Sequence, residues 1–182
     1  MATSAAILGF EMLDALHAAF SAEMHAGGKL ANLVSLRKTN QLAQNAAVNP
    51  SDVVGGIKMH GHGTPRPVGQ RVRDVDVPFD IILAARSQKT PAVVGGAGGK
   101  IALADDALAA LRPVIDDGAG GGVVGVLNNP ALFGLPQGGQ SLAQSSELGK
   151  GDFFEDLQGE GADQSVWVIY AVEYVVVGRY HF

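Results

Sequence analysis

The sequence has no cysteine and few charged side chains. Without cysteine, the chain cannot form disulfide bonds, thiolate metal sites or a cysteine nucleophile. Asp, Glu, Lys and Arg make up only 17% of the residues, whereas roughly a quarter is usual for a globular domain. So few charges leave much of the surface poorly solvated, and we expect partner molecules to cover part of it.

Long apolar runs and a targeting segment are also missing. The longest apolar run, Val166–Val177, is interrupted by Glu173 and is too short to cross a bilayer as a helix. Met1–Phe10 lacks the basic region of a signal peptide, and Glu11 follows at once. We therefore predict no signal peptide and no membrane partner.

Apolar residues make up 47% of the 182 residues, which suits a single domain spanning 1–182 with its own core.

The charge is unevenly distributed along the chain. From Lys29 to Lys100 there are ten basic and four acidic residues, and from Ile101 to Phe182 three basic and eleven acidic ones. Two interpretations stay open: two solvated faces that differ by chance, or opposite faces that meet between identical copies.

Helical periodicity predicts a helix over residues 5–26, with Leu8, Met12, Ala15, Ala19 and Met24 near one stripe and Leu16 and Phe20 beside it. Ser4 suits its N-cap, and Gly27 and Gly28 suit its end. Residues 30–42 fit either a second helix or a strand.

A Gly/Pro-rich polar segment covers residues 54–73. Pro65 and Pro67 exclude a helix interior and a central strand there, so the segment predicts a long loop or an extended hairpin arm that contacts other subunits. A Gly-rich stretch over 118–163 predicts an insertion, either a long loop or a flap, that also lies outside the core.

Alternating residues predict strands over 75–86 and 165–182. Phe79, Ile81, Leu83 and Ala85 share one face of the first. In the second, the even positions are apolar apart from Gly178, where the strand could bend, and the odd positions are too apolar to face only water. Residues 103–115 predict a short helix, with Asp105 and Asp106 at its start and Pro113 kinking it or ending it early.

Together these elements predict an α+β domain. We expect a mainly antiparallel sheet packed by the N-terminal helix and a second short helix, with long extended loops. The even-numbered face of the last strand should be buried in the subunit.

Catalytic and metal-binding patterns are weak. His60 and His62 could share one side of an extended chain, but no third and fourth ligand is evident nearby. The glycines at 95–99 lack the residues of a phosphate loop, because Val94 and Ile101 occupy its key positions. No Gly-x-Ser-x-Gly elbow occurs. We therefore predict no catalytic residue, no cofactor, no metal and no enzyme activity.

The order of elements resembles that of the tail-terminator (tail-completion) proteins of long-tailed bacteriophages, most clearly in the final Ser-Val-Trp-Val-Ile-Tyr-Ala-Val-Glu-Tyr segment. In that family a small α+β subunit forms a six-membered ring on the last ring of the tail tube and meets the head connector. The resemblance rests on element order, and the 118–163 insertion departs from the shorter members.

The resemblance implies a homo-oligomeric ring, expected to be a hexamer, in the tail or neck of a virion assembled in the bacterial host cytoplasm. Its partners would be the tail tube protein and the head–tail connector or stopper protein. Genome DNA would pass through the lumen without specific binding, and no aromatic residue interleaves with the basic segment Lys58–Arg73 to stack on bases. Another neck or tail-tube subunit, or a small-ligand-binding module, is the alternative.

The expected subunit interface contains Arg66, Arg71, Arg73 and Trp167, with the basic segment meeting an acidic one on the neighbouring copy. The acidic set Glu147–Asp163 either supplies that contact or faces the lumen, where it would keep DNA phosphates from sticking.

Overall fold

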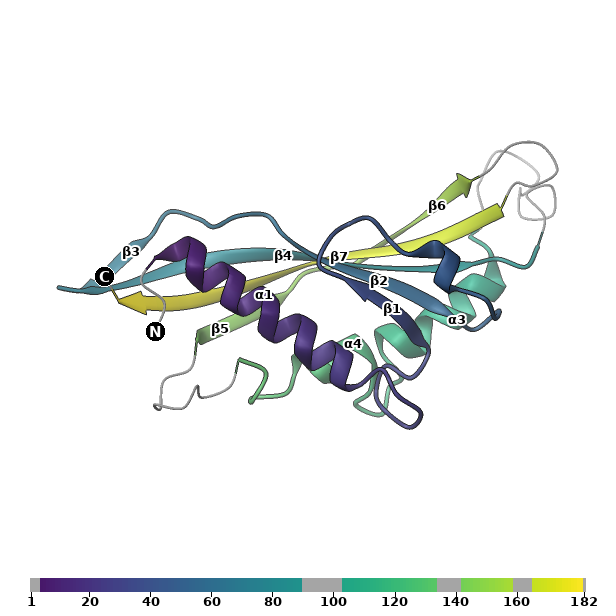
Figure 1. Cartoon of the computed structure of the whole chain (residues 1–182), viewed down its shortest axis with the longest axis horizontal. Helices are drawn as coiled ribbons and strands as arrows, with labels where there is room; N and C mark the ends of the chain where they lie inside the picture. Colours follow the sequence, from purple (N-terminus) through teal and green to yellow (C-terminus); the bar gives the residue numbers. More distant parts are fainter. Residues whose placement is uncertain (1–3, 90–102, 134–141, 159–164, 182) are drawn as a thin grey trace.

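The computed structural model describes residues 4–89, 103–133, 142–158 and 165–181. It confirms the predicted α+β class: a seven-stranded, mostly antiparallel sheet carries its helices on one face (Figure 1). The predicted glycine turn at 95–99 lies outside the described residues.

Two long strands form the centre of the sheet. β4 (Val72–Arg86) and β7 (Ser165–His181) pair antiparallel over the whole of β4, a ribbon about 50 Å long at about 3.3 Å per residue. The strand order is β1-β2-β4-β7-β5, with β3 also pairing with β4 and β6 with β7. The remaining strands are β1 (Leu33–Arg37), β2 (Val53–Met59), β3 (Arg66–Gly69), β5 (Ala143–Leu148) and β6 (Asp152–Gln158).

The helix-covered face of the sheet holds the main core. Odd positions of β4 and even positions of β7 are buried there, as the sequence predicts, against α1 (Ala5–Ala22), α3 (Asp105–Ile115) and α4 (Gly122–Leu127). β7 keeps its pairing with β4 through Gly178, and an added Cβ there would lie 2.4 Å from Met12 Cε. Gly178 therefore lets α1 approach the sheet closely.

α1 begins as predicted, because the Ser4 hydroxyl accepts a hydrogen bond from the Ile7 N–H. It ends earlier than expected, at Ala22, and the chain then turns through Gly27, whose φ is +86°. Its buried stripe is Leu8, Met12, Leu16 and Phe20, whereas the predicted Ala15, Ala19 and Met24 are only partly buried.

α1 is also the one described helix long and apolar enough to cross a membrane, with a mean hydropathy of 1.3. In this fold its apolar stripe packs on the sheet instead. The core helix of a globular domain has the same length and composition.

The opposite face of the sheet carries a second, smaller apolar cluster at one end. It consists of Val54, Ala84, Trp167 and Ile169, and no α-helix among the described residues packs on it. The chain between β1 and β2, which includes the 3-10 helix η1 (Gln44–Ala46), places Leu42, Ala46 and Ala47 on this cluster. This segment covers the apolar odd positions near the start of β7.

The predicted arm over 54–73 is wrong in its first part. β2 is an interior strand between β1 and β4, and its residues 53–57 are buried. Gly56 suggests a loop in the sequence, but packing requires a glycine at this position, since a Cβ there would lie 2.1 Å from the Thr39 carbonyl oxygen. Only 60–73 forms an extended hairpin, in which Pro67 lies on the edge strand β3.

The prediction that 118–163 is a loop or flap outside the core is also wrong, because Val123, Val126 and Leu127 belong to the main core and the stretch contains regular structure. It forms α4 and the two edge strands β5 and β6, both of which pair with β7. Its glycines again mark close approaches: a Cβ on Gly125 would lie 2.0 Å from the Gly120 carbonyl oxygen, and one on Gly151 would lie 2.1 Å from the Tyr170 ring. Residues 134–141 and 159–163 of this stretch lie outside the described residues.

Residues 30–42, left open by the sequence, contain strand β1 rather than a second helix. α3 continues for two residues past Pro113 to Ile115, so the proline does not end it early. Asp106, in the first turn of α3, accepts hydrogen bonds from the Gln88 N–H at 2.6 Å and the Ser87 hydroxyl at 2.9 Å. These bonds fasten α3 to the end of β4.

Candidate assembly surface

The β4–β7 ribbon ends in a cluster of arginines that we call the basic tip, comprising residues 66–76 and 178–181. It holds four arginines and two aspartates. Both aspartates are paired within the subunit. Arg66 donates two hydrogen bonds of 2.7 Å to Asp76, and Arg179 donates bonds of 2.7 and 2.9 Å to Asp74. These bidentate pairs fix the hairpin on the end of β7.

The pairing changes the protonation of both carboxylates. The hydrogen bond from Arg179 holds the pKa of Asp74 below its usual range, although partial burial opposes the change. Arg66 lowers the pKa of Asp76 in the same way. The tip therefore keeps its ion pairs at neutral pH, and the arginines outnumber the acids.

The structure gives the three predicted interface arginines different environments. Arg71 lies in the exposed turn between β3 and β4. Arg66 is exposed but already bound to Asp76. Arg73 is partly buried on β4, opposite Tyr180 of β7. Arg71 thus presents its charge most openly.

The other charged surface is what we call the acidic edge, residues 143–158. It comprises β5, β6 and the turn between them, and it carries four acids and one lysine. β6 is an edge strand in the described part of the sheet, paired only with β7. Three large apolar side chains are exposed on it: Phe153 at 39%, Phe154 at 48% and Leu157 at 56%. An edge strand with exposed apolar groups is a ready surface for another chain.

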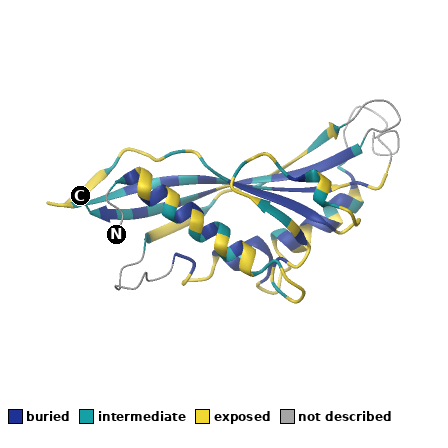
Figure 2. Ribbon diagram, in the orientation of Figure 1, coloured by how far each residue is buried: buried dark blue, intermediate teal, exposed yellow. Residues whose placement is uncertain are grey.

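The basic tip and the β6 part of the acidic edge lie toward opposite ends of the molecule (Figure 1), and each carries exposed residues, which are residues 66–71 in the tip (Figure 2). Val72 pairs with His181, and Asp152 pairs with Ala171. These partners on β7 are therefore about 33 Å apart at about 3.3 Å per residue. The β6 part of the acidic edge therefore cannot neutralise the basic tip within one subunit, whereas β5 begins beside the tip, where Ala143 pairs with Gly178.

Trp167 does not lie on the exposed surface where an interface residue was expected. It is 4% exposed, packs in the second apolar cluster, and donates a hydrogen bond from Nε1 to the Ser165 hydroxyl at 3.2 Å. Its own chain covers it through Leu42, Ala46 and Ala47.

The two loop histidines have local partners. His60 contacts the carboxylate of Asp80, and His62 lies 3.0 Å from the Gly63 carbonyl oxygen. Among the described residues, no group of three or more histidine, aspartate or glutamate side chains is placed to hold a metal ion.

Sequence reasoning missed the acidic edge as a structural unit. The segment Asp152–Gln158 places two phenylalanines side by side, so it lacks the strict alternation of a half-buried strand. The sequence feature that could have identified this strand is the group of Phe153, Phe154 and Leu157 within a stretch otherwise rich in glycine and acidic residues.

Comparison with known proteins assigns no relatives. The chain matches no family model, and a search of curated proteins finds no significantly similar sequence.

Proposed function

We propose that this chain is a virion structural protein that forms a homo-oligomeric ring, in the manner of the tail-terminator proteins that cap a phage tail tube and join it to the head connector. The observation that carries the proposal is the separation of the basic tip and the β6 part of the acidic edge along the β4–β7 ribbon. One copy can then offer its tip to the acidic edge of the next.

A contact made in one direction, from the tip of one copy to the acidic edge of the next, is head-to-tail, and repeating it by a rotation that closes gives a ring. A two-fold dimer of antiparallel ribbons makes the same contact twice, so the charges alone do not choose between the two arrangements. The ring is proposed on the resemblance in element order to tail-terminator proteins, and a two-fold dimer is the outcome that contradicts it.

The charges and the apolar groups have separate roles in this contact. Exposed ion pairs contribute about 0–1 kcal/mol each and are screened by salt, so they orient the subunits. The exposed apolar side chains of β6, together with Ile7 and Phe10 of α1, which are 44% and 59% exposed, are available to supply most of the affinity.

Charge reversal tests the proposal in the purified chain. Arg71→Glu changes an exposed residue of the tip, and Asp152→Lys changes an exposed residue of the acidic edge. We expect each variant to weaken self-association several-fold in sedimentation velocity at low salt, and a chain carrying both changes to recover part of the loss.

Arg37→Glu is the matched control, because Arg37 is an exposed arginine at the end of β1, outside both surfaces. It should associate like the unmodified chain. If the chain is monomeric under all conditions, or if Arg71→Glu behaves like the control, the proposal is wrong.

A further inference from the structure

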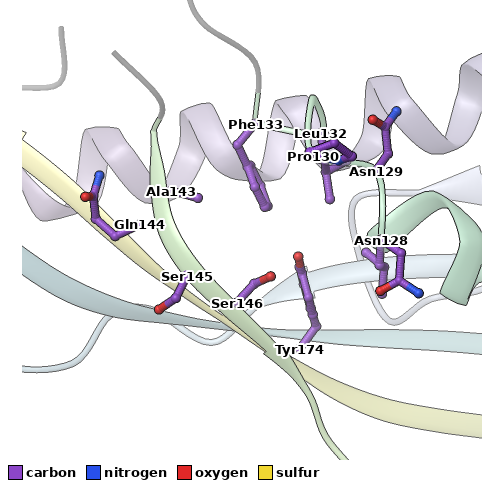
Figure 3. Close-up of a pocket in the computed structure, with 11 residues that line it drawn as sticks. Asn128, Asn129, Pro130, Leu132, Phe133, Ala143, Gln144, Ser145, Ser146 and Tyr174 are labelled. Carbon is purple, nitrogen blue, oxygen red and sulfur yellow. The ribbon is translucent and has the colours of Figure 1, made fainter.

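A cavity of about 290 Å³ lies between the segment that follows α4 and the strands β5 and β7 (Figure 3). Leu132 and Phe133 close it from above, β5 lines one side with Ser145 and Ser146, and Tyr174 of β7 forms its base. It belongs neither to the basic tip nor to the exposed strand β6.

Tyr174 places an unpaired hydroxyl at this cavity. The residue is 2% exposed, and its Oη has no hydrogen-bond partner among the described residues. Figure 3 shows the side chain rising from β7 with its hydroxyl directed toward the segment that carries Leu132 and Phe133. A buried polar atom without a partner costs about 1–3 kcal/mol, so such groups are rare and require an explanation.

The subunit itself does not satisfy this hydroxyl. Ser146 is the nearest polar side chain in Figure 3, and its hydroxyl offsets part of the rise that burial causes in the pKa of Tyr174. The two oxygens nevertheless do not reach hydrogen-bond geometry. Tyr174 stays protonated at neutral pH because burial raises its pKa, so it offers a hydrogen-bond donor.

The rest of the lining sets the chemistry of an occupant. Among the described residues that line the cavity there is no lysine, arginine, aspartate, glutamate or histidine, so these residues offer an ion no counter-charge. The amide side chains of Asn128 and Gln144 and the hydroxyls of Ser145 and Ser146 can donate and accept hydrogen bonds. Phe133 and Leu132 supply an apolar wall.

We propose that this cavity is a binding site for a small uncharged molecule that presents a carbonyl oxygen to the Tyr174 hydroxyl, of which a carboxamide is the simplest kind. The carbonyl accepts the phenol proton, the amide N–H groups meet serine or amide oxygens of the lining, and the apolar part lies against Phe133. The volume is at the small end for ligand sites, which suits a compact molecule. The proposal does not rest on the ring, although the β5 residues that line the cavity belong to the acidic edge.

Fluorine NMR tests the site directly, since the chain has only three tyrosines. The full-length protein is labelled with 3-fluorotyrosine, the Tyr174 signal is assigned by its loss in Tyr174→Phe, and acetamide is titrated in. We expect the Tyr174 signal to shift and saturate while those of Tyr170 and Tyr180 stay in place. Acetate, which has the same shape and a charge, should produce no saturable shift.

The contribution of the hydroxyl is measured by following the Ser146 amide in nitrogen-15 spectra. Tyr174→Phe should weaken acetamide binding about fivefold, as expected for the loss of one hydrogen bond, and Ser146→Ala on the exposed strand β5 provides a second variant. The proposal is overturned if acetate binds as well as acetamide, if the three tyrosine signals move together, or if neither variant changes the affinity. A Tyr174 signal that follows protein concentration instead of acetamide would assign the cavity to a second copy and also overturn it.

Discussion

Replacing Gly56 with alanine should lift the segment between β1 and β2 away from the sheet. The new Cβ would stand 2.1 Å from the Thr39 carbonyl oxygen and 3.2 Å from Leu42 Cδ2. Carbon atoms in contact are about 3.5–4.0 Å apart, so the Thr39 peptide must retreat by more than about 1 Å. Because the Thr39 oxygen belongs to the backbone, no change of side-chain rotamer can relieve this contact.

The cost can be estimated from this clash. Overpacking costs about 1–3 kcal/mol, and a clash with backbone belongs at the upper end. Alanine also lowers the conformational entropy of the unfolded chain, which stabilises the folded state by about 0.4–1 kcal/mol. We therefore expect Gly56→Ala to lower the free energy of unfolding by about 2 kcal/mol.

The same variant has an optical readout, because the displaced segment covers Trp167, the only tryptophan in the chain. Its fluorescence emission should move to longer wavelength as water reaches the ring. Gly69→Ala is the control, since its Cβ would have no neighbour closer than 3.7 Å, and it should leave emission unchanged. Unchanged emission and unchanged urea stability in Gly56→Ala would refute the assigned role of this segment.

Three further predictions concern the core, the tip and the hairpin. Tyr170→Ala should cost about 3–5 kcal/mol in urea unfolding, because the ring is 8% exposed and lies 4.9 Å from the Phe153 ring; a loss below about 1 kcal/mol would contradict its burial. The pair between Asp74 and Arg179 stabilises the fold above the ordinary aspartate pKa of about 3.9 and is lost as pH falls through the lowered folded pKa. Asp74→Asn should therefore flatten the acid side of a plot of Tm against pH, and an unchanged slope would count against the pair. Hydrogen exchange of the isolated chain should be slow in β2 and fast in 60–65, and equal protection would place the loop in the core.

The core of the fold was predictable where burial alternates strictly along a strand. β7 alternates over most of its length, and β4 does so from Val75 to Leu83, so periodicity alone located both strands and their buried faces. Ser4 correctly marked the start of α1, because its hydroxyl accepts a hydrogen bond from a backbone N–H of the first turn.

Prediction failed where glycine serves packing instead of flexibility. Gly56 and Gly125 look like loop residues, yet each sits where a neighbouring backbone carbonyl leaves no room for a Cβ. The carbonyl that crowds Gly56 belongs to Thr39 on the segment after β1, and the one that crowds Gly125 belongs to Gly120 in the turn before α4. Neither contact can be read from a glycine-rich composition, because it depends on how the chain turns. Both errors made interior or edge elements look like loops.

The candidate surfaces were predictable only in part. The charge split between the two halves of the chain was visible, and Arg71 remains an exposed member of the basic tip. The pairing of Arg66 with Asp76 could not be predicted from the sequence, because it depends on the register between β3 and β4. Trp167 looked like an interface residue because its covering segment lies more than a hundred residues away in the sequence.

Cysteine cross-linking measures the central claim, the head-to-tail contact, most directly. The chain has no cysteine of its own, so Arg71→Cys and Asp152→Cys can be introduced together as the only thiols. Within one subunit these sites are too far apart to join, because their strand positions are separated by about 33 Å and a disulfide needs Cα atoms within about 7 Å.

Mild oxidation of this variant should give a ladder of covalent oligomers that ends at one closed species without free thiols, as a head-to-tail ring requires. Each single-cysteine variant should form no disulfide-linked dimer, since like surfaces do not meet. An absent ladder, a ladder that stops at a closed dimer, or dimers that form equally well from a single-cysteine variant would contradict the account.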